Sequence, residues 1–599
     1  MKLYKFSLAL MIGIGVLTSC ESELDVENVN RQTATTFGQT ADELEESVIA
    51  AYNHTRMEGT YARVGYNYDV CRGDEVWNSS QVWYLPYDDL NSAIDNEMNQ
   101  WVWRDWYYTI NVCNYVLSKF VDKPDNSALS KQWQRIKGQA LFLRGLSYYN
   151  LVGYYQNPTL MLNYDDYAKL ETLYSANSSY DDVLKQAEAD FSEAMTLLPT
   201  RDEGGQWSLG RATSGAAAGY YARALMMHPT KENLQKALEV LTDIINTADG
   251  GNQKHGAYKL MANFGDNFRE GSAYENNAES LYEVQFLDYG TQGTDDEWTP
   301  VNTSANATQG HAIESNFGPG DFGGWADLSA SPWLYNLFKA EKTKNNSLDP
   351  RLYWTIGTYE TEWENFEYGN MCYGKKMAAD DYVVTNNNYG GLPIAKWTNM
   401  RTGLYESVVT GLHCGINLRM MRYSDVLLRA AECENEINGP TAKAIEWINI
   451  VRRRANLNDL SAADFTTADK LFEQIANVER PKEFGCEFGR GFDLIRWGFF
   501  YNSERLQQIK EHAAVNFWTK DDYAKGNVKY TPKDPVTYNG SSKSSFDNWL
   551  AGHEFIPIYI GILNANPKLT GNSANASSSN ASYYSTNGIT IHPVVDLDK

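Results

Sequence analysis

The sequence is poor in cysteine, histidine and positive charge. Its seven cysteines and eight histidines among 599 residues form no CxxC, HExxH or other metal-ligand spacing, and no GxSxG motif occurs. Lysine and arginine number 52 against 76 acidic residues, which gives a formal net charge of −24. Such a surface repels polyanions, so nucleic acids and acidic polysaccharides are poor candidates for a partner. We therefore expect no cofactor, no metal and no enzymatic activity.

Long hydrophobic runs are also missing. The uncharged run Phe6–Leu17 spans about twelve residues, whereas a helix needs roughly twenty to cross a bilayer. Lys2 and Lys5 precede this run and Leu17-Thr18-Ser19-Cys20 follows it, an order typical of an export signal. The last four residues resemble the bacterial lipobox, whose cysteine is acylated. We expect residues 1–19 to be a lipoprotein signal peptide, Cys20 to be the lipid attachment site, and the polar residues 20–40 to be a tether.

Aromatic residues are abundant instead, with 40 Tyr, 22 Phe and 17 Trp. Many of these rings must fill the core, because large rings bury the most area. Rings left at the surface bind sugars or peptides well, since they are flat, rigid and amphipathic. The six cysteines beyond Cys20 are expected to be mostly free and buried, because a chain of this length needs no disulfides for stability.

Hydrophobic periodicity predicts a mainly α-helical fold. Expected helices cover residues 41–57, 94–120, 129–155, 180–198, 213–228, 231–247, 423–437 and 441–455. Their pairing every 35 to 45 residues or so is typical of a tetratricopeptide-like array. We expect a helical-repeat portion at 41–250, a loop-rich lobe at 251–415, and a portion at 416–599 that completes the helical scaffold. Residues 59–92 are predicted to be irregular, and the Ser/Asn-rich stretch 571–587 to be an exposed loop.

A charged segment, residues 479–496, alternates acids and arginines among aromatic side chains. Glu487 and Asp493 could in principle be the carboxyl pair of a glycosidase. A buried ion-pair network within the scaffold is the favoured interpretation. The triplet Arg452–Arg454 is expected to give a solvated face with one buried pair, because consecutive helical residues point in different directions.

Several motifs resemble those of the SusD/RagB family. They are IKGQALFLRGLSYYNLVGYYQNPTL at 136–160, GRATSGAAAGYYARAL at 210–225, RYSDVLLRAAECENEI at 422–437, WINIVRRRANL at 447–457, IANVERPKEFGCEFGRGFDLIRWG at 475–498, and the closing segments 556–558 and 566–572. The resemblance implies a SusD-like fold of tetratricopeptide-like helix pairs with a loop-rich lobe. It also implies a lipid-anchored protein on the outer membrane, facing the cell exterior, that binds oligosaccharides and delivers them to a TonB-dependent, SusC-like transporter.

The same resemblance places the ligand between two aromatic regions, residues 66–87 and 289–335. Flat rings would lie against the apolar faces of a sugar, and polar side chains would bind its hydroxyls. The candidate ligand-binding residues are Trp77, Trp83, Tyr84, Trp298 and Trp325, with Arg72, Asp74 and Asn78 as polar partners. Three alternatives remain open: an oligopeptide-binding member of the family, a glycoside hydrolase, and a scaffold that binds no small ligand.

Overall fold

The fold is taken from a computed structural model of the chain. It describes residues 37–78, 83–123, 125–287, 310–376, 392–515, 528–531, 534–538, 543–571 and 576–598. The lipobox cysteine Cys20, most of the tether and Trp298 lie outside these residues. No helix in the described part is long and apolar enough to span a membrane.

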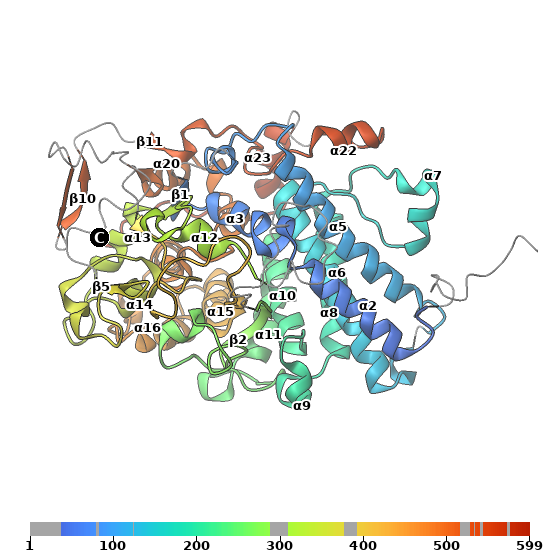
Figure 1. The fold of residues 1–599 in the computed structure, drawn as a ribbon, viewed down its shortest axis with the longest axis horizontal. Coiled ribbons are helices and arrows are strands. Elements are labelled where there is room, and N and C mark those ends of the chain that lie inside the picture. The colour runs from blue at the N-terminus through green and yellow to red at the C-terminus, as the bar shows by residue number, and fades with distance from the viewer. Residues whose placement is uncertain are drawn as a thin grey trace, which may run out of the picture.

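Long helices dominate the described structure (Figure 1). They are α2 (Ala41–His54), α5 (Glu97–Ser118), α6 (Lys131–Tyr155), α8 (Tyr180–Leu197), α10 (Ser214–Met227), α11 (Lys231–Ile244), α15 (Tyr423–Asn438) and α16 (Ala442–Arg454). Each begins within about three residues of its predicted start, so these helix predictions are confirmed. Serine or threonine caps most of them: the Thr40 side chain accepts from the Glu43 N–H in a capping box, and Ser179 accepts from the Asp182 N–H.

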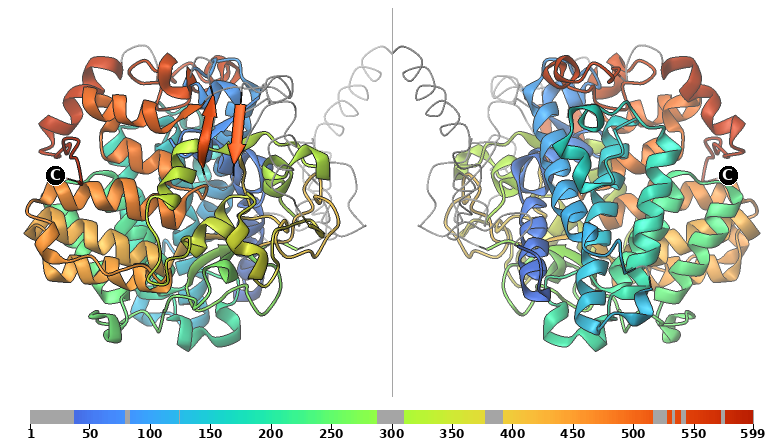
Figure 2. Two further views of the ribbon diagram at one scale, coloured as in Figure 1. Left: turned by 90° about the vertical axis from the view of Figure 1, so that its left-hand side faces the viewer. Right: turned by 90° about the vertical axis from the view of Figure 1, so that its right-hand side faces the viewer.

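The long helices pack in the order in which they occur in the chain. Contacts join α2 to α5, α5 to α6, α6 to α8, α8 to α10, α10 to α11, α11 to α15 and α15 to α16. The row formed by α2, α5, α6 and α8 is visible from the side in Figure 2. Glycines permit close approach in α10, where a Cβ at Gly219 would lie 2.5 Å from the Met421 sulfur. The array is therefore tetratricopeptide-like, as predicted.

Shorter elements form the rest of the molecule. The lobe after α11 contains α12 (Ile313–Phe317), α13 (Pro332–Lys339) and α14 (Pro350–Thr355), and the C-terminal portion adds α17 (Ala468–Gln474), α18 (Arg480–Phe484), α19 (Arg490–Arg496), α20 (Ser503–His512) and α22 (Ile560–Ala565). The described strands are short. One three-stranded sheet is made of β1 (Val76–Asn78), β3 (Leu328–Ala330) and β6 (Leu392–Pro393). Four antiparallel pairs are β2 (Ser280–Val284) with β7 (Leu418–Arg422), β4 (Met371–Cys372) with β5 (Lys375–Lys376), β8 (Ala514–Val515) with β11 (Lys543–Ser544), and β9 (Val528–Thr531) with β10 (Asp534–Tyr538).

Two stretches predicted to be loops contain helix. Residues 59–92 include a π-helical turn, η1 (Glu58–Ala62), the helix α3 (Val64–Cys71) and the short α4 (Leu85–Asp88), as well as β1. Every residue of α3 is buried, so no polar face gives it a helical period. The Ser/Asn-rich stretch contains α23 (Ala576–Thr586), whose Tyr584 is buried and donates a hydrogen bond to the Ile495 carbonyl.

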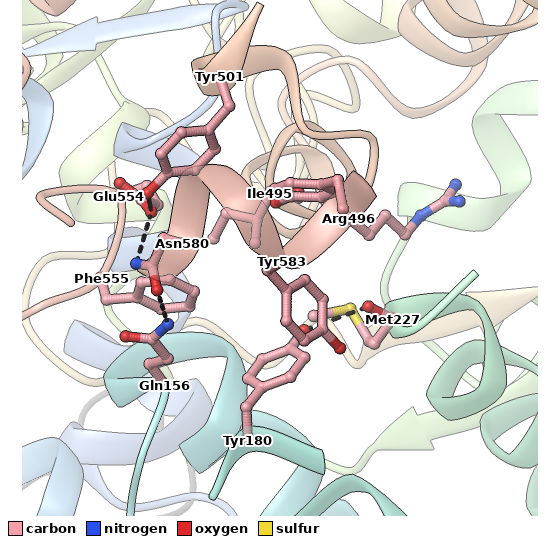
Figure 3. A pocket seen from close by; sticks show the side chains of 11 residues that line it. Gln156, Tyr180, Met227, Ile495, Arg496, Tyr501, Glu554, Phe555, Asn580 and Tyr583 are labelled. Carbon is pink, nitrogen blue, oxygen red and sulfur yellow. Dashed lines mark hydrogen bonds between the residues drawn. The ribbon is translucent and has the colours of Figure 1, made fainter. Parts of the chain in front are cut away.

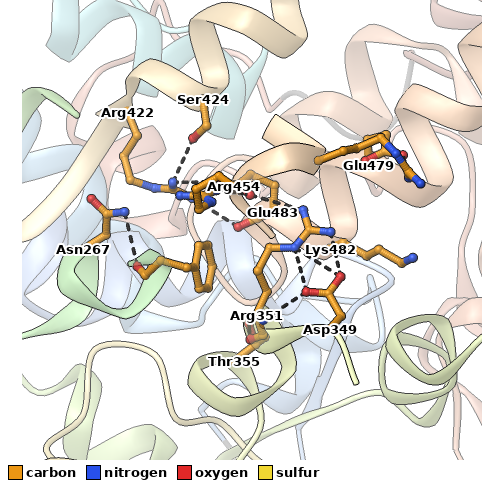
Figure 4. A network of polar contacts seen from close by, with 12 residues as sticks. Asn267, Asp349, Arg351, Thr355, Arg422, Ser424, Arg454, Glu479, Lys482 and Glu483 are labelled. Carbon is orange, nitrogen blue, oxygen red and sulfur yellow. Dashed lines mark hydrogen bonds and ion pairs between the residues drawn. The ribbon is translucent and has the colours of Figure 1, made fainter. Parts of the chain in front are cut away.

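Buried arginines and carboxylates join the helical array to the lobe. Glu483 accepts from Arg454 at 2.5 Å and Arg422 at 2.8 Å, and Arg351 lies 3.3 Å away (Figure 4). We call this cluster, together with the contacts of Asp425 and Asp493, the ion-pair network. Asp493 pairs with Arg480 at 2.6 Å and Arg496 at 2.7 Å, while Asp425 pairs with Arg223 at 2.8 Å. The prediction of a buried ion-pair network at 479–496 is confirmed, although Glu479 Oε2 has no hydrogen-bond partner among the described residues.

The arginine triplet on α16 is more buried than predicted. Arg452 pairs with Glu479 at 2.6 Å and Arg454 pairs with Glu483, and both arginines are buried. Only Arg453 is exposed, where it meets Glu446 and Asp459. The expectation of a single buried pair was wrong, because the acidic partners come from distant segments. The six cysteines beyond Cys20 are free and buried, as expected.

Candidate functional site

An antiparallel strand pair brings the two predicted aromatic regions together. Strand β1 pairs with β3, with Trp77 opposite Ser329 and Asn78 opposite Leu328. The end of β1 lies beside the start of β3, so the chain that leads towards Trp83 leaves the strand pair at the end where the chain that contains Trp325 enters it. Elements from distant parts of the chain, α3 and α12 among them, surround this point (Figure 1).

These two tryptophans differ from the other aromatic candidates in exposure. Trp83 is 48% exposed and Trp325 is half-buried, whereas Trp77 and Tyr84 are 3% and 2% exposed. We call Trp83 and Trp325, with the half-buried Trp101 of α5 that meets Arg63, the aromatic surface. Rings that remain partly open to water are available for a ligand.

The polar candidates are buried. Asp74 is fully buried; it accepts from Arg490 Nε and lies 2.8 Å from His512 Nδ1. Burial disfavours its charge, but Arg490 and His512 hold the pKa of Asp74 below its usual range. Asn78 is buried, and its backbone N–H donates to Asp88. These contacts fix the segment that leads into β1.

Arg72 is the exception among the buried polar candidates. It ends α3 and is 2% exposed, yet its Nε and Nη2 atoms have no hydrogen-bond partner among the described residues. Burial lowers the pKa of Arg72, and the charge of Asp69 opposes this effect. A guanidinium with unpaired donors beside the first aromatic region is unusual, because buried donors are normally satisfied.

A polar chain joins the two aromatic regions below the rings. Asn67 Nδ2 donates to Asn316 Oδ1 at 2.8 Å and lies 3.2 Å from the Tyr84 hydroxyl. Asn316 Nδ2 in turn donates to Asp327 Oδ2 at 2.7 Å. Burial raises the pKa of Asp327 to about 6, and the Asn316 hydrogen bond and the charge of Arg63 oppose the rise. We call Tyr84, Asn67, Asn316 and Asp327 the polar chain.

The turn η1 adds a cation that the sequence did not reveal. Arg63 pairs with Glu58 at 3.1 Å, and its guanidinium carbon lies 5.8 Å from the Trp101 ring centroid. Thr60 interrupts the helical geometry, and π-helical turns are frequent at functional sites. Gly59 is required here, since a Cβ would lie 2.2 Å from the Trp101 carbonyl oxygen. No spacing in the sequence marks Arg63, Trp101 or Asp327 as neighbours.

The described residues hold no group of three or more His, Cys, Asp or Glu that could bind a metal ion. A groove of about 530 Å³ lies between α2 and β2, on the face of the helical array.

Comparison with known proteins identifies the family. A profile described as "SusD family" matches residues 278–574, and a second, described as "Starch-binding associating with outer membrane", matches residues 23–226. Together they cover most of the chain. The chain belongs to the SusD/RagB family. The second description places it among proteins associated with the outer membrane.

Individual SusD relatives match most of the chain at low identity. A "SusD-like protein P25" from Formosa agariphila is 25% identical over 84% of this chain and 90% of its own length. A SusD superfamily structure from Bacteroides vulgatus is 24% identical, with a TM-score of 0.66 over 90% of this chain and all of that one. "Surface glycan-binding protein A" from Bacteroides uniformis gives a TM-score of 0.63 at 20% identity, covering 89% and 99% of the two chains. These likenesses show a SusD-like fold, as predicted.

Proposed function

We propose that the chain is a non-catalytic surface lipoprotein that captures neutral oligosaccharides and delivers them to a TonB-dependent outer-membrane transporter. The observation that supports this most directly is the pairing of β1 with β3, because it joins the two aromatic regions in which the candidate tryptophans lie. The SusD membership supports it further, and a structural neighbour bears the name surface glycan-binding protein.

Capture would use the rings and the polar groups differently. Trp83 and Trp325 present flat faces to the apolar side of a sugar, and Trp298 from the same region joins them in the proposal. Arg72, Asp74, Trp77, Asn78 and Tyr84 are assigned a supporting role, since all are buried. Arg63, whose guanidinium carbon lies 5.8 Å from the Trp101 ring centroid, and Asp327 are buried as well and take the same supporting role.

Isothermal titration against neutral oligosaccharides tests the capture step. We expect binding to the intact chain, loss of that binding in a Trp83→Ala/Trp325→Ala double variant, and no release of reducing sugar from the ligand. Binding of peptides without binding of any glycan would support the oligopeptide alternative. Release of reducing sugar would support the glycoside hydrolase. Absence of binding to both glycans and peptides would favour a scaffold that binds no small ligand.

The lipid anchor is proposed at Cys20, with residues 21–40 as a flexible tether outside the cell. A Cys20→Ala variant should keep the far-UV circular dichroism of the intact chain and disappear from the membrane fraction. Protease added to whole cells should cleave the intact chain if it faces the exterior. A Cys20→Ala chain that still incorporates labelled fatty acid would contradict this assignment.

Hand-over requires a surface for the transporter, and the helical array is the proposed surface. Ile49 of α2 is 51% exposed and Tyr108 of α5 is 38% exposed, although both helices are otherwise amphipathic with a buried face. An Ile49→Glu/Tyr108→Glu variant should lose co-purification with the transporter while keeping glycan affinity. Leu404→Glu, an equally exposed apolar residue of the lobe, is the matched control.

A further inference from the structure

A buried histidine, His592, anchors the chain that follows α23. Residues 587–598 form neither helix nor strand, and Ile589 and His592 are their only buried side chains. We call residues 587–598 the C-terminal segment. None of its residues belongs to the aromatic surface or to the docking surface proposed above.

Both ring nitrogens of His592 face a carboxylate. Nδ1 lies 2.6 Å from Asp469 Oδ1, and Nε2 lies 2.6 Å from Glu436 Oε1. The two carboxylates belong to different helices, α17 and α15. An ionised carboxylate only accepts hydrogen bonds, so each ring nitrogen must carry a hydrogen, and only the imidazolium cation carries two. This geometry therefore requires a protonated His592.

The surroundings of His592 favour the cation. The imidazole is stacked on Phe472, with ring centroids 4.1 Å apart and planes at 16°. Burial by itself lowers the pKa of His592, but the hydrogen bonds and charges of Glu436 and Asp469 outweigh it and raise this pKa above 6.5. Among the described residues, neither carboxylate has another ion-pair partner.

Other charged groups near His592 pair with one another. The groups that surround it are Glu432 and Glu436 of α15, Asp469 and Glu473 of α17, Arg496 of α19, Arg505 of α20 and Lys231 of α11. Arg496 pairs with Glu432, and Arg505 pairs with Glu473. Glu436 and Asp469 are thus the carboxylates whose charge His592 balances.

Arg505 holds the backbone of the C-terminal segment at the same point. Its Nε donates to the His592 carbonyl at 2.8 Å, and its Nη2 donates to the Pro593 carbonyl at 2.7 Å. Arginine keeps its proton at any physiological pH, so these two bonds do not change with pH. Deprotonation of His592 instead sets a lone pair against a carboxylate and leaves Arg505 to hold the segment alone.

Helix α23 remains a fixed point in either state. Gln156 Nε2 donates to Asn580 Oδ1 at 2.6 Å (Figure 3), and the Tyr584 hydroxyl donates to the Ile495 carbonyl at 2.6 Å. Neither bond involves a group that titrates near neutral pH. A change in the charge of His592 therefore acts on the C-terminal segment and spares the helix before it.

The C-terminal segment closes one side of a cavity of about 180 Å³. Gly588, Ile589, Thr590 and His592 form this wall, and the others come mainly from α11, α15 and α17. Movement of the segment would open the cavity to water.

We propose that the C-terminal segment is a pH-sensitive clasp, closed while His592 is a cation and opened when His592 loses its proton. In the open state, His592 titrates near its ordinary pKa of about 6.5. Because the pKa is higher in the closed state, the stabilisation of that state is full below 6.5 and is lost as pH rises through the higher value. The ratio of open to closed segments should rise by up to about tenfold for each pH unit between the two pKa values.

Selective ¹⁵N labelling of histidine measures the protonation of His592 in the full mature chain. The His592 signals are those absent from His592→Gln. We expect both ring nitrogens to be protonated at pH 7 and the pKa to lie above 6.5. A pKa at or below 6.5 overturns the proposal, because the closed state would then gain nothing from the cation.

A nitroxide label on the C-terminal segment measures its movement. Val594 is 37% exposed and the six cysteines beyond Cys20 are buried, so Val594→Cys in a Cys20→Ala chain gives one accessible thiol. We expect its electron paramagnetic resonance spectrum to change from immobile to mobile between pH 6 and 9. His592→Gln in this chain should be mobile throughout. A label that stays immobile up to pH 9 contradicts the clasp.

Asp469→Asn separates titration from simple packing. Asp469 is 40% exposed, so the fold should tolerate the change, and the midpoint of the mobility transition should move to lower pH because one carboxylate is lost. The control is His255→Gln, since burial lowers the pKa of His255 and this residue lies outside the clasp. An unchanged midpoint in Asp469→Asn, or an equal shift in His255→Gln, would refute the role of His592.

Discussion

The ion-pair network and the polar chain beneath the aromatic surface both bury carboxyl groups next to aromatic rings, but they surround them differently. In the network, burial disfavours the charge of Glu483, yet Arg454, Arg422 and Arg351 hold its pKa well below the usual range. In the polar chain, burial raises the pKa of Asp327 to about 6, since an amide and a more distant guanidinium compensate only in part. Buried carboxyl groups of the ion-pair network thus have a lowered pKa, whereas the buried carboxyl group of Asp327 in the polar chain has a raised pKa.

This difference has a structural cause. Each network carboxylate contacts two or three arginines, so its charge is neutralised within the fold. In the polar chain, the neutral amides of Asn67 and Asn316 and the Tyr84 hydroxyl take the place of these arginines. A scaffold gains from full pairing, whereas a glycan-binding surface gains from groups that can still hydrogen-bond a hydroxyl.

Removal of a network charge should have the largest effect. Glu483→Gln leaves Arg351, Arg422 and Arg454 buried with too little negative charge, and we expect a loss of about 3 to 5 kcal/mol in the free energy of unfolding. Urea denaturation measures it. Glu446→Gln, which breaks the exposed pair with Arg453, is the control and should cost about 1 kcal/mol or less. Equal losses in both variants would remove the distinction between the two regions.

Removal of a ring from the aromatic surface should weaken ligand binding and leave the free energy of unfolding nearly unchanged. Trp83→Ala should weaken oligosaccharide affinity by about 2 kcal/mol, roughly 30-fold, while the unfolding free energy changes by about 0.5 kcal/mol. Calorimetric titration and urea denaturation give the two numbers. Trp207→Ala removes a half-buried tryptophan from the helical side and should leave the affinity unchanged. A large loss of stability in Trp83→Ala would mean that this ring belongs to the core.

The pH dependence of stability should have opposite signs in the two regions. The pKa of Asp327 in the folded chain is about 6. The stabilisation that the Asp327 carboxyl group gives the folded state is therefore full below about pH 4 and is lost as the pH rises through 6. Between pH 4 and 7, the free energy of unfolding of Asp327→Asn should therefore rise by up to about 2 kcal/mol relative to that of the intact chain. The pKa of Asp493 is depressed, because Arg480, Arg496 and Arg429 outweigh its burial, so its contribution is lost as pH falls below about 4.

Measurement of these two slopes requires urea denaturation at several pH values. Asp493→Asn should be destabilised most near neutral pH, and the gap to the intact chain should narrow in acid. Parallel slopes for Asp327→Asn and Asp493→Asn would contradict the contrast between a neutralised and a titratable carboxyl.

Much of the helical array could be predicted from sequence, because its signals are local. An apolar stripe and a Ser or Thr cap identify α8 and α11 within a few residues of their ends. Helix α3 escaped prediction because it is buried on every side. The Ser/Asn-rich α23 escaped because its stability comes from Tyr584 packing against a distant segment, which composition does not reveal.

The sequence indicated the two regions of the candidate site, but it did not indicate which of their residues are exposed. An excess of tryptophan and the family resemblance indicated the two loops that β1 and β3 join. They could not reveal that Asp74 pairs with Arg490, because hundreds of residues separate the two. Exposure depends on such tertiary contacts, so a sequence cannot tell Trp83 from the buried Trp77.

The pairing of Asp74 with Arg490 also sets an order of events during biogenesis. The two residues are 416 positions apart, and Gly489 donates a backbone hydrogen bond to Asp69 in the same place. The segment before β1 is therefore synthesised well before its partners, and contacts of such long range form slowly. A truncated chain that ends before Arg490 has the tryptophans but lacks the support that arranges them. Under the proposed function, ligand capture would therefore require the full-length chain.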